Sequence, residues 1–219
     1  MRIAIIGGGG YVGLVTGLGF AELGNQVVCV DVDESKVTQL CAGKSPIYEQ
    51  GIENMLRRNL EAGRVSFHTK IGSAVSESDV VFVAVGTPSA SDGNADLSQV
   101  IGAAEAVAHH LNGYKVIVIK STVPVGTVEL VRGILRRGFT EGEDFDVVSN
   151  PEFLREGRGL YDFMYPNRIV IGSLSQRASQ VMKDLYAPLV DGNALWDEAP
   201  PPADREIPVP IVDTDLASA

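Results

Sequence analysis

Residues 2–31 read RIAIIGGGGYVGLVTGLGFAELGNQVVCVD, and this stretch decides the fold. The short apolar run Arg2–Ile6 predicts a strand that leads directly into four glycines. Tyr11–Gly24 predicts a helix that ends at a glycine, and Gln26–Val30 predicts a second strand. A strand, a glycine-rich turn, a helix and a second strand, in this order, predict a βαβ unit, from which parallel sheets are built.

The glycines of the turn match the pattern G-x-G-x-x-G at Gly8, Gly10 and Gly13. Between a strand and a helix, this pattern is typical of dinucleotide binding. Gly8 permits the tight turn, Gly10 leaves room for a pyrophosphate, and Gly13 lets the helix lie close to the strand. N–H groups around Tyr11 and Val12 at the start of the helix would bind the phosphates. The simpler alternative is a glycine turn that holds no ligand.

An acidic residue is expected at the end of the second strand of such a unit, and Asp31 lies there, 23 residues after Gly8. Its carboxylate would accept the hydroxyls of the adenosine ribose and repel a 2′-phosphate, which predicts NAD rather than NADP as the cofactor. Lys36 would partly offset that repulsion. Alternatively, Asp31 and Asp33 both cap the helix predicted from Glu34; we assign the cap to Asp33 and the ribose to Asp31.

Helix-like and strand-like segments continue to alternate along the chain. The predicted helices are Glu34–Ala42, Ile52–Ala62, Leu97–Leu111, Thr127–Arg137 and Gln176–Tyr186, and the predicted strands are Val65–Thr69, Asp79–Val85, Lys115–Lys120, Phe145–Ser149 and Arg168–Gly172. Alternation of this kind implies right-handed crossovers. We therefore predict that residues 1–190 form an α/β domain, a Rossmann-like, doubly wound parallel sheet with helices on both faces.

Two loops follow strands that are predicted to be buried on both faces. The first comprises Val85, Gly86, Thr87 and Pro88, and the second runs from Ser121 and Thr122 to Gly126. Open α/β sheets bind their ligands at the carboxyl ends of strands, so these hydroxyls, glycines and prolines favour a floor for the nicotinamide and its ribose. Ordinary strand-to-helix turns, with Thr127 as an N-cap, are the alternative.

Charge and composition exclude several classes of protein. The 219 residues carry 28 acidic and 18 basic side chains, a formal net charge of -10, which disfavours electrostatic binding to a nucleic acid. No apolar run reaches the roughly 18–20 residues of a membrane helix, and Met1 does not begin a signal peptide. We expect a cytoplasmic protein that binds neither a membrane nor a nucleic acid.

Residues 191–219 differ from the rest of the chain. They hold seven acidic residues, one basic residue and five of the 11 prolines. Proline fixes φ and lacks an N–H donor, so this segment is predicted to be neither a helix nor a central strand. We interpret it as an acidic, proline-rich linker or a loosely attached tail.

The cysteines and histidines indicate neither a catalytic thiol nor a metal site. Cys29 lies in an apolar strand and Cys41 ends a helix, so both are expected to be structural. His68, His109 and His110 lack the spacing of metal ligands, and we predict no metal site.

Seven segments, in order between residues 7 and 172, make the chain resemble the UDP-glucose 6-dehydrogenase family of nucleotide-sugar dehydrogenases. They are GGGYVGLVTGLGFAELG, CVDVDESKV, PIYEQGIENML, VAVGTPSASDGNADLS, KSTVPVGT, SNPEFLREG and DFMYPNRIVIG. SNPEFLREG beside KSTVPVGT is the most specific pair. Gln50 replaces the usual proline and Asn25 a common histidine, and neither departure touches the proposed site. The resemblance covers nearly all of this chain but only the amino-terminal half of the family pattern.

The resemblance implies two successive NAD-dependent oxidations at C6 of a UDP-sugar, from the alcohol to the carboxylate. Between them a cysteine captures the aldehyde, so that a second hydride can leave and form a thioester that water hydrolyses. It also implies that Glu152 is the acid/base or water-organising carboxylate and that Thr122 holds the catalytic water. Phe153, Leu154 and Arg155 would line the sugar nucleotide, with Glu152 and Glu156 beside them, and Glu156 would approach the nicotinamide. Without the resemblance, these two glutamates would be interpreted as solvated acids that balance Arg155 and Arg158.

The family's nucleophilic cysteine, catalytic lysine and asparagine belong to regions beyond the matched half. The segment PIVDTDLASA at residues 210–219 resembles the lead-in to a long central helix that forms the family's dimer. A homodimer is thus implied for a full-length member, and we expect this chain by itself to be a monomer that does not oxidise the sugar. A GDP-mannose or UDP-N-acetylmannosamine dehydrogenase is the nearest alternative, and a catalytically silent NAD-binding module is the other.

Overall fold

A computed structural model describes residues 1–90, 93–194 and 196–216. In this part of the chain, one sheet has the strand order β3-β2-β1-β4-β5-β6-β7-β8. The strands are β1 (Arg2–Ile6), β2 (Gln26–Val30), β3 (Val65–His68), β4 (Val80–Val83), β5 (Lys115–Ile119), β6 (Phe145–Ser149), β7 (Ile169–Ser173) and β8 (Ile211–Thr214). The helices are α1 (Tyr11–Glu22), α2 (Glu34–Cys41), α3 (Ile52–Glu61), α4 (Ile71–Ser76), α5 (Ser98–His110), α6 (Thr127–Leu135), α7 (Gly159–Met164) and α8 (Gln176–Val190).

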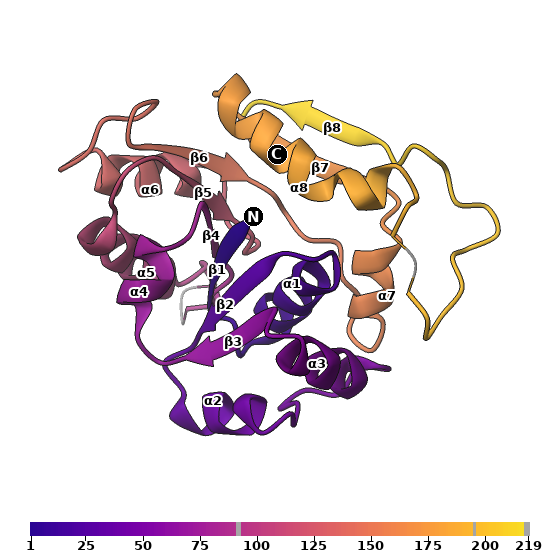
Figure 1. Cartoon of the computed structure of the whole chain (residues 1–219). Helices are drawn as coiled ribbons and strands as arrows, with labels where there is room; N and C mark the ends of the chain where they lie inside the picture. The colour runs from indigo at the N-terminus through magenta and orange to yellow at the C-terminus, as the bar shows by residue number, and fades with distance from the viewer. Residues whose placement is uncertain (91–92, 195, 217–219) are drawn as a thin grey trace.

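Strand β1 is central, and the chain winds outward from it in both directions. β2 and β3 lie on one side of it and β4, β5 and β6 on the other, and all these neighbours are parallel. Successive side chains of a strand point to opposite faces, so Ile3 and Ile5 join the core beneath α1, α3, α7 and α8, whereas Ala4 and Ile6 join the core beneath α4, α5 and α6. Figure 1 shows these two helical layers. The predicted Rossmann-like, doubly wound fold with helices on both faces is confirmed.

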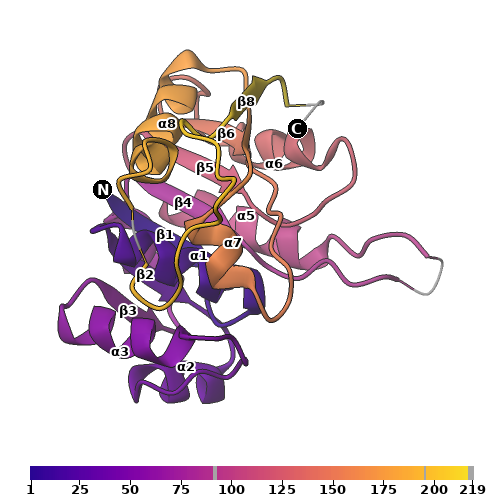
Figure 2. The ribbon, with the colours of Figure 1, turned by 90° about the vertical axis from the view of Figure 1, so that its right-hand side faces the viewer.

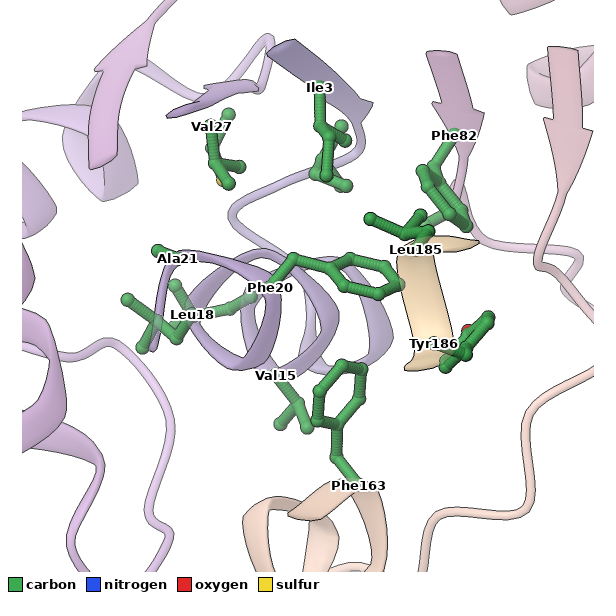
Figure 3. Close-up of a cluster of buried hydrophobic side chains, with 14 of the residues drawn as sticks. Ile3, Val15, Leu18, Phe20, Ala21, Val27, Phe82, Phe163, Leu185 and Tyr186 are labelled. Carbon is green, nitrogen blue, oxygen red and sulfur yellow. The ribbon is translucent and has the colours of Figure 1, made fainter. Parts of the chain in front are cut away.

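An aromatic cluster fixes α1 and α7 against the sheet (Figure 3). The ring of Phe20 on α1 lies 5.2 Å from that of Phe82, 5.1 Å from that of Phe163 on α7 and 5.2 Å from that of Tyr186 on α8. A Cβ at Gly19 would lie only 2.2 Å from the Phe163 ring, so the two helices approach through this glycine. Burial of each such aromatic ring stabilises the fold by roughly 1.5–3 kcal/mol. The cluster thereby places the segment that precedes α7 beside the start of α1.

Strand β7 runs antiparallel to β6, with Val148 opposite Ser173, so the predicted parallel sheet contains one antiparallel pair. Because β7 is antiparallel to β6, it starts near the carboxyl end of β6, and the connection that contains the six-residue helix α7 does not recross the sheet. The 15-residue helix α8 is long enough to recross the sheet, and β8 is accordingly parallel to β7.

The segment from residue 191 onward is attached more firmly than we expected. Trp196 is 4% exposed and Val209 is 2% exposed. The backbone N–H of Trp196 donates to the hydroxyl of Tyr165 over 3.1 Å, and that hydroxyl donates to the Ala199 carbonyl over 2.8 Å. The segment then adds β8 to the edge of the sheet, a position that neighbouring prolines permit. The buried Trp196 and Val209 and the paired strand β8 are therefore not loosely attached, whereas the role of the segment as a linker to a further domain stays a prediction.

Two predictions fall partly on residues that the structure does not describe. These are Ser91 and Asp92 in the segment VAVGTPSASDGNADLS and Ala217, Ser218 and Ala219 in PIVDTDLASA. Around the first gap, the loop between β4 and α5 extends away from the sheet (Figure 2). Over the described residues, no helix is both long and apolar enough to cross a membrane.

Candidate functional site

The glycine turn lies at the carboxyl end of β1, tightly against its neighbours. The N–H groups of Gly7 and Gly8 both donate to the Val30 carbonyl over 2.9 Å. A Cβ at Gly13 would lie 2.2 Å from the Gly7 oxygen, and a Cβ at Gly8 would lie 2.6 Å from the Cβ of Cys29. The close approach of helix and strand predicted for Gly13 is therefore present.

Gly10 differs from these glycines because nothing in the protein crowds it. The nearest heavy atom to an added Cβ would be the Gly7 oxygen at 3.4 Å, and the backbone there is extended, with φ −82° and ψ 170°. Gly10 is also the N-cap of α1, with no side-chain cap and no acidic residue in the first turn. Open space beside uncapped N–H groups at Tyr11 and Val12 fits the pyrophosphate of a dinucleotide.

Asp31 and Asp33 have different roles, as the sequence predicts. Asp33 caps α2, since its Oδ1 accepts from Ser35 N over 2.9 Å and from Lys36 N over 3.2 Å. The Oδ2 of Asp31 instead accepts from Gly9 N over 2.9 Å, and its Oδ1 accepts from Asp33 N over 3.0 Å. The Asp31 carboxylate is thus held against the glycine turn at Gly9, and its role as a ribose ligand stays a prediction.

The two predicted floor loops are joined to each other. Thr87 Oγ1 donates to the Thr122 carbonyl over 3.0 Å, and Ser121 Oγ donates to the Val85 carbonyl over 2.6 Å. They follow β4 and β5, which are adjacent strands. The N-cap of α6 is Gly126, with φ +94°, and not Thr127. The cap assigned to Thr127 is therefore wrong, whereas the alternative that these loops are ordinary strand-to-helix turns stays open.

Carboxylates hold the backbone of the segment that follows β6. The Glu152 carboxylate accepts a hydrogen bond from Leu154 N. Arg155 pairs with Asp162 over 2.6 Å and also donates its backbone N–H to that carboxylate over 2.9 Å. Arg155 is thus paired with Asp162 and not with the neighbouring glutamates, and the interpretation of Glu152 and Glu156 as solvated acids stays an alternative. Glu156 is exposed and lies on the same segment as Phe153.

A pocket of about 330 Å³ lies between this segment, α7 and β7, and Lys120 forms part of its wall together with Asn150, Glu152 and Tyr186. Lys120 is 5% exposed, and its Nζ donates to Asn150 Oδ1 over 3.1 Å and to Tyr186 Oη over 3.3 Å. Burial lowers the pKa of Lys120 to about 8, although the Glu152 carboxylate opposes this shift. The sequence places Lys120 at the end of the predicted strand Lys115–Lys120 and within KSTVPVGT without predicting a role for it, although a charged residue that ends an apolar strand is itself a signal of a site.

The buried Cys29 matches its predicted structural role, whereas Cys41 is exposed and its role stays a prediction. Cys29 is buried on β2, and burial raises the pKa of its thiol, so it is a poor nucleophile. Cys41 is exposed at the end of α2, and its Sγ contacts the Phe67 carbonyl on β3. Among the residues that the structure describes, no group of three or more histidines, cysteines or acids could hold a metal ion.

Comparisons with known proteins agree with this geometry. Residues 1–190 match the model of the UDP-glucose/GDP-mannose dehydrogenase family, NAD binding domain. The UDP-glucose 6-dehydrogenase TuaD of Bacillus subtilis is 51% identical over 187 residues, which are 85% of this chain and 40% of TuaD.

Two solved structures extend the likeness to the fold. A UDP-glucose dehydrogenase from Pyrobaculum islandicum is 41% identical, with a TM-score of 0.85, over 99% of this chain and 46% of that one. A GDP-mannose dehydrogenase from Pseudomonas aeruginosa is 33% identical, with a TM-score of 0.88, over 100% of this chain and 47% of that one. The chain thus spans less than half the length of these relatives. It belongs to the UDP-glucose/GDP-mannose dehydrogenase family, of which it represents the NAD-binding domain.

Proposed function

We propose that this chain is the cofactor-binding half of an enzyme that oxidises the C6 alcohol of UDP-glucose to the carboxylate of UDP-glucuronate. The observation that carries the proposal is the common edge of the sheet. The carboxyl ends of β1, β4, β5 and β6 bring together the glycine turn, the two floor loops and the Glu152 segment. Ligands of open α/β sheets bind at this edge.

Each part of the edge has a task in the proposal. Gly8, Gly10 and Gly13 with the first turn of α1 bind the pyrophosphate, and Asp31 binds the adenosine ribose. The loops that contain Thr87 and Thr122 support the nicotinamide end. When bound, NAD supplies the acceptor for each hydride that leaves C6.

Glu152 is proposed to manage the proton and the water of the hydrolytic step. It lies on the wall of the pocket, where the backbone of residues 153–155 would line the sugar nucleotide. Its carboxylate is held by Leu154 N, and the ammonium of Lys120 contributes a favourable charge nearby. A held carboxylate beside a substrate pocket suits a general base that orients a water molecule, with Thr122 as its partner.

The thiol of the reaction is proposed to come from another part of the enzyme. Cys29 is buried, and Cys41 contacts β3, five strands away from β6. At the roughly 4.8 Å spacing of strands, that separation is about 24 Å. Covalent capture of the aldehyde therefore requires the carboxyl-terminal domain that the family resemblance implies.

A GDP-mannose dehydrogenase is the second candidate, because the Pseudomonas aeruginosa enzyme of that name has this fold over the whole chain. The experiment joins residues 1–190 to the carboxyl-terminal part of TuaD and measures NADH formation with UDP-glucose and with GDP-mannose. The proposal expects two equivalents of NADH per UDP-glucose. Turnover of GDP-mannose alone would favour the second candidate. A folded chimera that binds NAD but oxidises neither sugar would favour the silent module.

A further inference from the structure

Glu49 is a buried acid that the site described above does not use. It lies between α2 and α3 in the segment PIYEQGIENML, and it is 5% exposed. Its Oε1 accepts from the hydroxyl of Tyr11 over 2.6 Å and from Gly157 N over 2.6 Å, and its Oε2 accepts from Gly159 N over 2.9 Å. One carboxylate thus joins three segments that are far apart in the sequence.

These contacts are closely fitted. A Cβ at Gly159 would lie 2.4 Å from the hydroxyl oxygen of Tyr11, so this contact requires glycine. Gly51, with φ +78°, lies two residues after Glu49, and a Cβ there would clash with Glu198 and with Trp196. Both of those residues belong to the segment that follows α8. That segment therefore covers the turn that contains Glu49. Hydrogen bonds to a carboxylate are about twice as strong as hydrogen bonds between neutral groups.

The hydrogen bonds of Glu49 connect the two parts of the proposed site, the cofactor site and the sugar-nucleotide segment. Tyr11 is the first residue of α1 and follows Gly10, where the pyrophosphate is proposed to bind. Its hydroxyl also lies 2.7 Å from the carbonyl oxygen of Arg155, within the proposed sugar-nucleotide segment. Burial, with the hydrogen bond to Glu49, raises the pKa of Tyr11, so the hydroxyl keeps its proton and remains a donor.

We propose that Glu49, acting through Tyr11, couples the cofactor site to the sugar-nucleotide segment 152–159, so that occupation of one site orders the other. Glu49 is a positioning residue in this proposal, which rests on the proposed function. The first turn of α1 becomes fixed when the cofactor binds, and the Tyr11 hydroxyl then fixes Glu49 and the amides of Gly157 and Gly159. By linkage, a sugar nucleotide that orders the segment must strengthen cofactor binding by the same factor.

The test measures amide hydrogen exchange of the 219-residue chain by NMR, with and without saturating NAD. The proposal expects NAD to raise the protection of the Gly157 and Gly159 amides by about fivefold or more, the lower end of typical couplings. In Tyr11→Phe, which keeps the ring and the backbone N–H and is measured at an NAD concentration that saturates the variant, this increase is lost. In Glu49→Gln the increase is also lost, and the double variant behaves like either single variant.

The control is Glu53→Gln, which removes a neighbouring acid that pairs with Arg57 on the surface over 2.7 Å. It should retain the full NAD-dependent increase. If the role of Glu49 were purely structural, Glu49→Gln would lower the protection of these amides equally with and without NAD, and the NAD-dependent increase would remain. An unchanged increase in Tyr11→Phe overturns the coupling but leaves the proposed function standing, even if Glu49→Gln does not fold. Failure of the unaltered chain to bind NAD overturns both.

Discussion

At the scale of single residues, Asp31 is proposed to set the preference for NAD over NADP. Its carboxylate already accepts from Gly9 N and Asp33 N, and a ribose would add hydroxyl donors. Hydrogen bonds to a charged group contribute roughly 1.5–3 kcal/mol, so Asp31→Ala should weaken NAD binding by about tenfold or more. Asp31→Asn keeps the size and the acceptor but loses the repulsion of a 2′-phosphate, so it should narrow the preference for NAD over NADP. Calorimetric titration measures both, and tighter binding of NADP by the unaltered chain would contradict this assignment.

Glu152 gives a second prediction at this scale, in the TuaD chimera. Glu152→Gln should slow turnover by about 10²–10⁴-fold, as is typical of lost acid/base groups, and leave NAD affinity nearly unchanged. Glu143→Gln is the control, because Glu143 is exposed and precedes the amino end of β6 rather than following its carboxyl end. Full turnover by Glu152→Gln would show that this acid is only a surface group.

Lys120 makes the stability of the fold depend on pH. Its pKa is about 8 in the folded chain, against an ordinary value of 10.5. Between these values the unfolded state binds more protons, so stability rises as the pH rises through this window. The gain is at most about 3 kcal/mol. The charged and titratable groups nearest to its Nζ are Glu152 and Tyr186.

The measurement is the free energy of unfolding in urea, from pH 7 to pH 10, for the unaltered chain and for Lys120→Met. Because other groups titrate in both proteins, the difference between the two isolates Lys120. We expect the free energy of unfolding of the unaltered chain to rise relative to that of Lys120→Met as the pH increases above 8. A difference that stays constant with pH would mean that Lys120 has an ordinary pKa in the folded chain.

At the scale of elements, the contact of α1 with α7 is sensitive to any side-chain atom added at Gly19. An alanine at Gly19 would place its Cβ inside the contact distance of the Phe163 ring. Such overpacking typically costs about 1–3 kcal/mol, and the shift would also move the start of α7, which carries Gly159. Gly102 on α5 is the matched control, since nothing lies within 4 Å of an added Cβ there. Gly102→Ala should stabilise the chain by about 0.5–1 kcal/mol.

Thermal unfolding by circular dichroism measures both glycine variants. Gly19→Ala should melt below the unaltered chain and Gly102→Ala above it. Equal effects would mean that helix propensity, and not the approach of α7, decides the outcome at Gly19.

The sequence predicts the long elements well, and the shorter ones show why prediction fails. The strands β1, β2 and β6 have their predicted bounds because apolar runs identify strands that are buried on both faces. The helices α4 and α7 have six residues each, too few for a helical period to be recognised. Strand β8 lies among prolines and acids, and its pairing with β7 depends on partners that are remote in sequence. Helix α8 continues past its predicted end to Val190, with Pro188 in its last turn.

The candidate site divides in the same way. The glycine turn and the separate roles of Asp31 and Asp33 follow from local spacing. The burial of Glu49 and Lys120 does not, because each is decided by a segment about 30 or more residues away in the chain. Nothing in PIYEQG by itself shows that its glutamate accepts from Tyr11 and from Gly157.

At the scale of the whole molecule, the 219-residue chain should bind NAD without oxidising UDP-glucose. The glycine turn, Asp31 and both floor loops lie at one edge of the sheet, so the chain holds all the residues that are proposed to contact the cofactor. The described cysteines are the buried Cys29 and the remote Cys41, so no thiol can capture an aldehyde. Even the first oxidation would lack the opposing sugar-binding domain, and positioning of reactants accounts for roughly 7–11 kcal/mol of a barrier.

Two measurements on the purified chain check this prediction together. Calorimetry with NAD should show binding, and NADH absorbance with UDP-glucose should show no turnover. The family resemblance assigns the dimer contacts to a central helix outside residues 1–219, so sedimentation should give the 23.3 kDa monomer. Sustained formation of two NADH per UDP-glucose by this chain would contradict the assignment of the nucleophilic thiol to another part of the enzyme, since it would require a reactive thiol on this half. A stable dimer would instead assign an interface to the sheet edge or to the helices of this domain.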